Sequence, residues 1–152
     1  YHLLRKTMSD AIKFQCDLNT TNLSTPLGFE VLFNGKSAFK IDHVTETCQI
    51  VFDVNDDEAA QKLQFVMTGK TVEHTLVDAQ GNITSDAMLT ISNVIIDDID
   101  ISLLLNDKSK YTHNFNGTQP AVEDKFYGVM GCNGTVTFEF TTPFYLWLLE
   151  HM

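Results

Sequence analysis

The sequence predicts an all-β protein, a single-domain jelly-roll-like β-sandwich of about eight antiparallel strands. Apolar and polar residues alternate with a period of two in most of its apolar segments, which is the spacing of strands and not of helices. These segments are rich in β-branched and aromatic residues. Short stretches of Gly, Asn and Asp separate them, as turns separate the strands of a sandwich or barrel.

Length and composition indicate one globular domain. The 152 residues match the usual size of a single domain, and 43% hydrophobic against 20% charged residues are typical of a folded core. We expect residues 8–152 to form this domain. Residues 1–7 are expected to be a non-native or upstream leader, because Met8 and the two residues after it resemble a natural start. That residues 1–7 belong to the native chain is the open alternative.

Charge and hydrophobicity exclude two classes of partner. The formal net charge of −10, with ten scattered Lys and Arg residues, argues against nucleic acid and disfavours an anionic membrane surface. Acidic character fits cations or neutral ligands, and it also fits a protein that the charge simply keeps soluble. We expect no signal peptide, because the first residues lack its apolar core, and no apolar run approaches the roughly 20 residues of a transmembrane helix. We therefore expect no membrane insertion.

The N-terminal third is expected to form a strand and then a hairpin. Alternation in residues 12–16 predicts the strand, and a polar loop follows it. Two apolar segments, 29–33 and 38–41, flank Asn34 and Gly35, the strongest short-range hairpin signal in the chain. The register that keeps apolar groups on one face needs a three-residue loop. It pairs Val31 with Phe39, Phe29 with Ile41 and Glu30 with Lys40.

The middle of the chain, residues 63–105, is expected to contain two strand-like halves joined by a turn. Alternation is clear at residues 63–67 and resumes over residues 89–103. The connection at residues 78–82 contains the Gly and Asn that tolerate positive φ. A further strand is expected at residues 48–54, and residues 59–61 are expected to add one helical turn.

The C-terminal third alternates polar loops with strands. Residues 135–141 alternate cleanly and give the least ambiguous strand. Residues 144–149 are apolar on every side, so we expect them to be buried on both faces, in the core or against another subunit. The alternative is a short helix with Thr142 as its cap and Pro143 at its first position. In either case Trp147 belongs to the core.

The possible metal ligands in the sequence are three cysteines and several acidic residues. Cys16, Cys48 and Cys132 are widely spaced and predict buried hydrophobic side chains, neither a disulfide framework nor a zinc site. A candidate calcium site has alternating oxygen donors but lacks the Gly and the distal Glu of an EF-hand. Its residues are Asp53, Asn55, Asp56 and Asp57. The alternative is a solvated strand end, and Asp98 and Asp100 are expected to point to water.

A second group of residues has the chemistry of a sugar site. Aromatic faces pack on the C–H surface of a pyranose, and amides bind its hydroxyl groups. The candidate ligand-binding residues are Tyr111, His113, Asn114, Asn116, Phe126 and Tyr127. They come from a polar, turn-rich region that is long for a compact domain, where function is often found. The alternative is a set of turns packed by their own aromatic residues.

The sequence lacks three common catalytic motifs. There is no GxSxG, no HExxH and no glycine-rich phosphate loop. The many carboxylates lack the apolar setting that would raise the pKa of a general acid. We therefore predict a protein that is not an enzyme and has no organic cofactor, with calcium as the candidate ion.

Several segments carry a resemblance to known proteins. The runs LQFVMTGKT, YTHNFNG and MGCNGTVTFEFTTPFYLWLLE resemble small proteins encoded by aquatic tailed phages, over nearly the whole of residues 8–152. In the layout of its strands, and in the strand that contains VMTGKT, the chain is also similar to the β-sandwich carbohydrate-binding modules of the calcium-dependent, xylan-binding kind. That family's calcium ligands cannot be placed residue by residue on this chain.

The resemblance implies a non-catalytic binding module, associated with a virion or displayed at an extracellular surface. Its expected ligand is a carbohydrate, bound with the help of calcium, and its expected partners are copies of itself or other virion proteins. The alternative is a structural virion protein, a decoration or connector subunit without a small-molecule ligand. Such a subunit would self-associate through residues 144–149 and exposed sheet edges.

Overall fold

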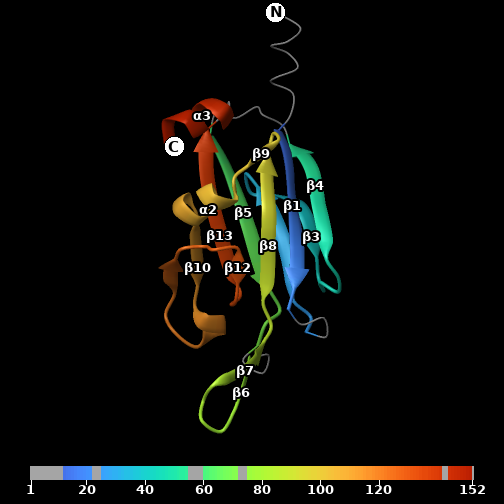
Figure 1. The fold of residues 1–152 in the computed structure, drawn as a ribbon, viewed down its shortest axis with the longest axis vertical. Coiled ribbons are helices and arrows are strands. Elements are labelled where there is room, and N and C mark those ends of the chain that lie inside the picture. Colours follow the sequence, from blue (N-terminus) through green and yellow to red (C-terminus); the bar gives the residue numbers. More distant parts are fainter. Residues whose placement is uncertain (1–11, 22–24, 55–59, 72–74, 142–143, 152) are drawn as a thin grey trace, which may run out of the picture.

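The computed structural model describes residues 12–21, 25–54, 60–71, 75–141 and 144–151 (Figure 1). It is a single-domain β-sandwich, which confirms the fold class predicted from the sequence. The leader expected at residues 1–7 lies outside the described residues. Within the described ranges, no helix has the length and apolar character needed to cross a bilayer.

One sheet has the strand order β12-β8-β1-β4, and β9 pairs with β8 at its edge. Its strands are β1 (Ile12–Thr20), β4 (Cys48–Val54), β8 (Leu89–Ile96), β9 (Ile99–Asp100) and β12 (Val129–Met130). All of these pairs are antiparallel. The register of β1 shifts at a bulge between Gln15 and Asp17, opposite the middle of β8.

The other sheet has the order β11-β10-β13-β5-β2-β3, again with antiparallel pairs throughout. Its strands are β2 (Gly28–Phe33), β3 (Lys36–Ile41), β5 (Ala60–Thr68), β10 (Lys110–His113), β11 (Val122–Asp124) and β13 (Gly134–Thr141). The predicted pairs of the hairpin are confirmed, because Val31 pairs with Phe39, Phe29 with Ile41 and Glu30 with Lys40. The predicted three-residue loop was wrong: Phe33 pairs with Lys36, so the loop has two residues, and a register shift after Val31 takes up the extra residue instead.

A small hairpin of β6 (Thr75–Val77) and β7 (Ile83–Asp86) projects from one end of the sandwich (Figure 1). The predicted turn between them is present, with hydrogen bonds from Asn82 and Gly81 to Asp78 closing it. Seven strands have six or more residues, and the others have two to four. The sequence predicted about eight strands, fewer than the thirteen in the described residues, because alternation needs several residues to be visible.

The core lies between the two sheets and is dominated by phenylalanine. Phe65 of β5 is 1% exposed, with its ring centroid 6.1 Å from that of Phe14 on the opposite sheet. Phe29 and Phe126 lie 5.8 and 6.2 Å from Phe65. The rings of Phe14, Phe29 and Phe65 come from alternate, inward-facing positions of their strands, as the period-two pattern predicted, whereas Phe126 lies in the connection between β11 and β12. Burial of these large rings is the main stabilising term of the sandwich.

Two predictions for the middle of the chain were wrong. Ala60 and Gln61 belong to β5 and not to a helical turn, because Gln61 packs inward and accepts a hydrogen bond from the Asn34 amide at 2.6 Å. The strand expected to run to residue 103 and beyond ends earlier, and α2 (Ser102–Lys108) follows β9. Leu103 is 83% exposed, whereas Ile101 and Leu105, four residues apart, are both buried on one side of the helix.

The apolar C-terminal segment forms helix α3 (Phe144–His151), the alternative that the sequence left open. Phe144 and Trp147 are buried against β13, which confirms the core position of Trp147. The expectation of burial on both faces was wrong, because Tyr145, Leu146 and Leu149 are 48, 46 and 68% exposed. The predicted cap and first position, residues 142 and 143, lie outside the described residues.

All three cysteines are free. Cys16 is fully buried in β1, and burial raises the pKa of its thiol to about 12. Cys48 and Cys132 are half-buried, less than the sequence predicted. A thiol with so high a pKa is not a nucleophile at neutral pH, so Cys16 acts as a small hydrophobic residue.

Candidate functional site

Two of the predicted sugar-binding residues, Tyr111 and His113, are buried in β10. They are 6% and 8% exposed, and both face inward because they are two residues apart on one strand. The Tyr111 hydroxyl accepts a hydrogen bond from the Cys132 amide at 2.9 Å and donates one to the Cys132 carbonyl. Burial raises the pKa of Tyr111 to about 12. His113 Nε2 lies 2.8 Å from a carboxylate oxygen of Asp124.

The side chains of Asn114 and Asn116 also form hydrogen bonds with backbone amides of the protein. The Asn114 side chain accepts a hydrogen bond from the Gly117 amide at 2.9 Å. Asn116 has a left-handed backbone with φ of 60°, and its side chain accepts one from the Asn133 amide at 2.9 Å. The polar side chains of this loop therefore form hydrogen bonds within the protein and hold the loop in place. This favours the alternative stated for the sequence, a set of turns that pack on themselves.

Phe126 and Tyr127 are neighbours in sequence but point in opposite directions. Phe126 is 1% exposed and belongs to the core, whereas Tyr127 is 68% exposed. Both residues line one cleft of about 310 Å³, with Phe126 in its floor and Tyr127 at its surface. The other four predicted sugar-binding residues do not line this cleft. We call it the Tyr127 cleft.

The Tyr127 cleft lies between β8, the β9–α2 corner and the segment before β12. Its floor is apolar, with Ile91, Val94, Leu105 and Phe126, all of them buried. The polar lining residues are Ser92, Asn93, Asp100, Ser102 and Asn106. An apolar floor with a few converging polar groups is the usual composition of a ligand site.

Local backbone geometry shapes this cleft. Gly128 has φ of +89°, and its carbonyl accepts a hydrogen bond from the Ile91 amide at 2.8 Å, which ties the Tyr127 segment to β8. On β8 itself, Asn93 has φ of 51° and interrupts the strand alternation. Its side-chain amide donates to Asp17 at 2.8 Å. These contacts fix the cleft wall in the free protein.

The β9–α2 corner is equally well ordered. The Asp100 carboxylate accepts a hydrogen bond from the Ser102 amide at 2.9 Å, and the Ser102 hydroxyl accepts one from the Val94 amide at 3.2 Å. The half-buried Asn106 side chain makes no hydrogen bond with any residue whose position the structure describes. Its amide is therefore a donor and acceptor available to a ligand.

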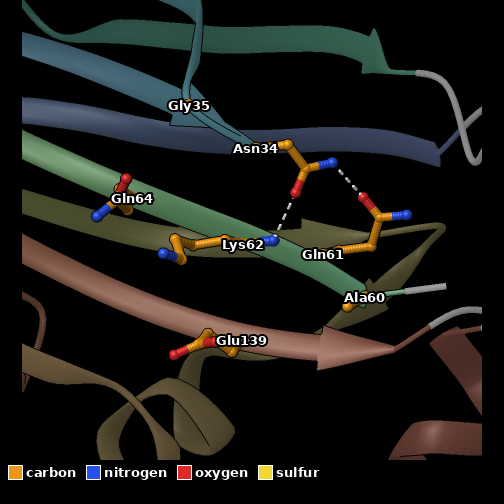
Figure 2. A pocket seen from close by; sticks show the side chains of 7 residues that line it. All are labelled: Asn34, Gly35, Ala60, Gln61, Lys62, Gln64 and Glu139. Atoms are coloured by element: carbon orange, nitrogen blue, oxygen red, sulfur yellow. Dashed lines mark hydrogen bonds between the residues drawn. The ribbon is translucent and has the colours of Figure 1, made fainter. Parts of the chain in front are cut away.

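A second cleft, of about 370 Å³, lies on the outer side of the other sheet (Figure 2). Its wall is polar: the Asn34 side chain accepts a hydrogen bond from the Lys62 amide at 2.7 Å, and Figure 2 shows Gln64 and Glu139 on adjacent strands. Gln64 donates to Thr137 at 3.3 Å. No aromatic side chain lines this cleft, so it has no face on which a sugar ring could stack.

The predicted calcium site is described at one residue only. Asp53 lies near the end of β4, paired with Lys13 of β1, while Asn55, Asp56 and Asp57 lie outside the described residues. Oxygen donors of this kind fit calcium chemically. Across the ranges that the structure describes, no three His, Cys, Asp or Glu side chains come together as a metal-binding group.

Sequence reasoning missed the polar residues of the Tyr127 cleft. Asp100 is exposed, as expected, but its place beside the cleft was not predicted, and Asn93 and Asn106 were not singled out. Only Asn93 carried a signal, because an Asn that interrupts the alternation of a strand suggests positive φ. The position of Asn106 depends on helix α2, which the sequence did not predict.

Two solved structures with a similar fold were found, both of vCBM60. One is vCBM60 in complex with galactobiose, with 11% sequence identity, coverage of 83% of this chain and 96% of that chain, and a TM-score of 0.49. The other is the selenomethionine form, reported for the evolutionary link that circular permutation provides between two families of calcium-dependent carbohydrate binding modules. It has 9% identity, coverage of 84% and 89%, and a TM-score of 0.52.

At this level of identity the second structure supports a shared β-sandwich fold and nothing beyond it. No protein-family model matches the chain, and no curated protein matches it in sequence.

Proposed function

We propose that this chain is a non-catalytic carbohydrate-binding module and that its sugar site is the Tyr127 cleft. The observation that carries the proposal is the exposed Tyr127 ring beside polar groups and above an apolar floor. The fold shared with a carbohydrate-binding module supports the same class of function. As part of this proposal we place the protein on a virion or another extracellular surface, as the resemblance of its sequence implies.

The chemistry of the cleft suits a neutral sugar. The Tyr127 ring can pack on the C–H face of a pyranose, while the Asn106 amide and the Asp100 carboxylate bind hydroxyl groups. The cleft volume of about 310 Å³ is near the lower limit for ligand pockets, which fits one or a few sugar units. Asp100 is the one carboxylate among its lining residues, and glycoside hydrolysis normally requires two. The cleft therefore favours binding without catalysis.

We expect Tyr127→Ala to weaken oligosaccharide binding at least tenfold, a loss of about 1.4 kcal/mol, because the stacking face is removed. Binding is measured by titration calorimetry with a panel of neutral oligosaccharides that includes galactobiose and xylobiose. The matched control is Tyr145→Ala, which removes another exposed tyrosine, from α3, and should bind normally. A site in the other cleft would be indicated by unchanged binding of Tyr127→Ala together with weaker binding of Gln64→Ala.

Calcium dependence is a second part of the proposal, located at Asp53 and the three residues predicted with it. We expect millimolar calcium, but not magnesium, to raise the melting temperature by several degrees, because an ion that binds only the native state stabilises it by mass action. Asp53→Asn should abolish the rise. A calcium effect that persists in Asp53→Asn would place the ion elsewhere, and the absence of any effect would remove calcium from the proposal.

The alternative function is a self-associating structural subunit of a virion. It is favoured by the exposed apolar surface of α3, formed by Tyr145, Leu146 and Leu149. Sedimentation velocity separates the two functions. A stable oligomer that dissociates in Leu149→Lys, in a protein that binds none of the oligosaccharides, would support the structural role.

A further inference from the structure

A buried lysine stands at the end of the sandwich that carries the β6–β7 hairpin. Lys70 follows β5, and its side chain is 2% exposed. Its ammonium nitrogen lies 2.5 Å from a carboxylate oxygen of Asp86 and 2.6 Å from the carbonyl oxygen of Gly131. Lysine is almost never fully buried without a partner, so this placement requires an explanation.

The environment of the ammonium group is a set of oxygen ligands for a cation. Burial of an unpaired charge is very unfavourable, and the carboxylate of Asp86 offsets that cost by pairing with it. A backbone carbonyl supplies the second oxygen. Carboxylate and carbonyl oxygens are also the ligands that calcium takes in proteins. The position that a metal ion could occupy is therefore filled by a group of the chain itself.

The backbone amide and the backbone carbonyl of Lys70 both form hydrogen bonds with the same side chain, that of Asn133. The Asn133 side chain accepts a hydrogen bond from the Lys70 amide at 2.9 Å and donates one to the Lys70 carbonyl at 2.8 Å. The Asn133 amide in turn donates to Asn116 at 2.9 Å. Through these contacts Lys70 connects three segments that are distant in sequence. We call them, residues 69–71, 114–117 and 131–133, the Lys70 cluster.

We propose that the Lys70 ammonium is the structural cation of the Lys70 cluster, which holds these three segments in place without a metal ion. This proposal goes beyond sugar binding and is separate from the calcium proposal. Asp53 pairs with Lys13 near the start of β1, whereas Thr21, just beyond the end of β1, donates to the Asp86 carbonyl. The two locations are thus at opposite ends of a nine-residue strand.

The test is native-state hydrogen exchange of two amides, those of residues 70 and 133, followed by NMR. In the unmodified protein we expect EDTA or millimolar calcium to change these exchange rates less than twofold relative to the amides of β1, so that a general stabilisation by calcium bound elsewhere is cancelled. Lys70→Met keeps the side-chain length but removes the charge, and it should speed both amides at least tenfold. Lys62→Met, which removes an exposed lysine from β5, is the matched control and should leave them unchanged.

Two results would overturn the proposal. One is exchange of these two amides that accelerates tenfold relative to the amides of β1 when the unmodified protein is treated with EDTA, because the cluster itself would then depend on a metal ion. The other is exchange in Lys70→Met equal to that of Lys62→Met. If Lys70→Met does not fold, Asp86→Asn takes its place, since it removes the counter-charge and keeps an acceptor oxygen. We expect at least threefold faster exchange in Asp86→Asn, and unchanged rates would contradict the proposal.

Discussion

Replacement of Phe65 by Ala is expected to lower the free energy of unfolding by about 3–5 kcal/mol. Phe65 is 1% exposed at the centre of the sandwich, where its ring meets those of Phe14 and Phe29, from the two sheets, and of Phe126. Truncation removes the buried area and leaves a cavity that ordered strands on both sides cannot collapse to fill. The loss is a large share of the stability of a typical domain.

The effect of Phe65→Ala is measured by urea unfolding and by the thermal midpoint, which we expect to fall by about 6–20 °C. Tyr127→Ala is the control, because it removes a similar ring from the surface and should change stability by less than about 0.5 kcal/mol. Phe126 lies both against Phe65 and in the floor of the Tyr127 cleft. A loss below about 1 kcal/mol would mean that the core repacks easily, contrary to the ring cluster described above.

The alternation of apolar and polar residues was sufficient to predict strands in which one face is buried. The pairing of residues 29–31 with residues 39–41 was predicted correctly because a shift by one residue would expose their apolar side chains. The loop was predicted one residue too long, because a bulge inside the hairpin leaves no signal in the alternation. The same reasoning failed at α2 and left a strand and a helix both open at α3. An apolar run that follows a strand fits a buried strand or a short helix equally well, and only the tertiary position of the run decides between them.

The candidate site was only partly predictable for a related reason. Alternation implies that Phe126 and Tyr127 point to opposite sides and that Tyr111 and His113 point to the same side. It does not say which side is the core. Asp100 and Asn106 reach the Tyr127 cleft through the β9–α2 corner, a tertiary arrangement with no signal in sequence spacing. Burial of Lys70 depends on Asp86 and Gly131, which are distant in sequence.

Gly69→Ala is expected to destabilise the protein by about 2–5 kcal/mol. The left-handed backbone, with φ of +90°, costs a residue with a side chain about 1–2 kcal/mol. A Cβ atom at this position would also lie 2.3 Å from the Pro26 carbonyl oxygen, a backbone atom that cannot rotate away. Overpacking of this kind adds about 1–3 kcal/mol. Because Gly69 directly precedes Lys70, relief of the clash must also move the Lys70 cluster.

Comparison with Gly35→Ala separates the two causes of the destabilisation expected for Gly69→Ala, which are the backbone conformation and the steric clash. Gly35 has a similar φ of +82°, but a Cβ atom there would meet nothing within 4 Å. Its substitution should therefore cost only the conformational term of about 1–2 kcal/mol. Urea unfolding of the two variants gives the contribution of the clash as their difference, and exchange of the residue 70 amide should accelerate in Gly69→Ala alone. Equal stability of the two variants would mean that the chain around Pro26 yields without cost, and that the conformation of Gly69 does not hold Lys70 in place.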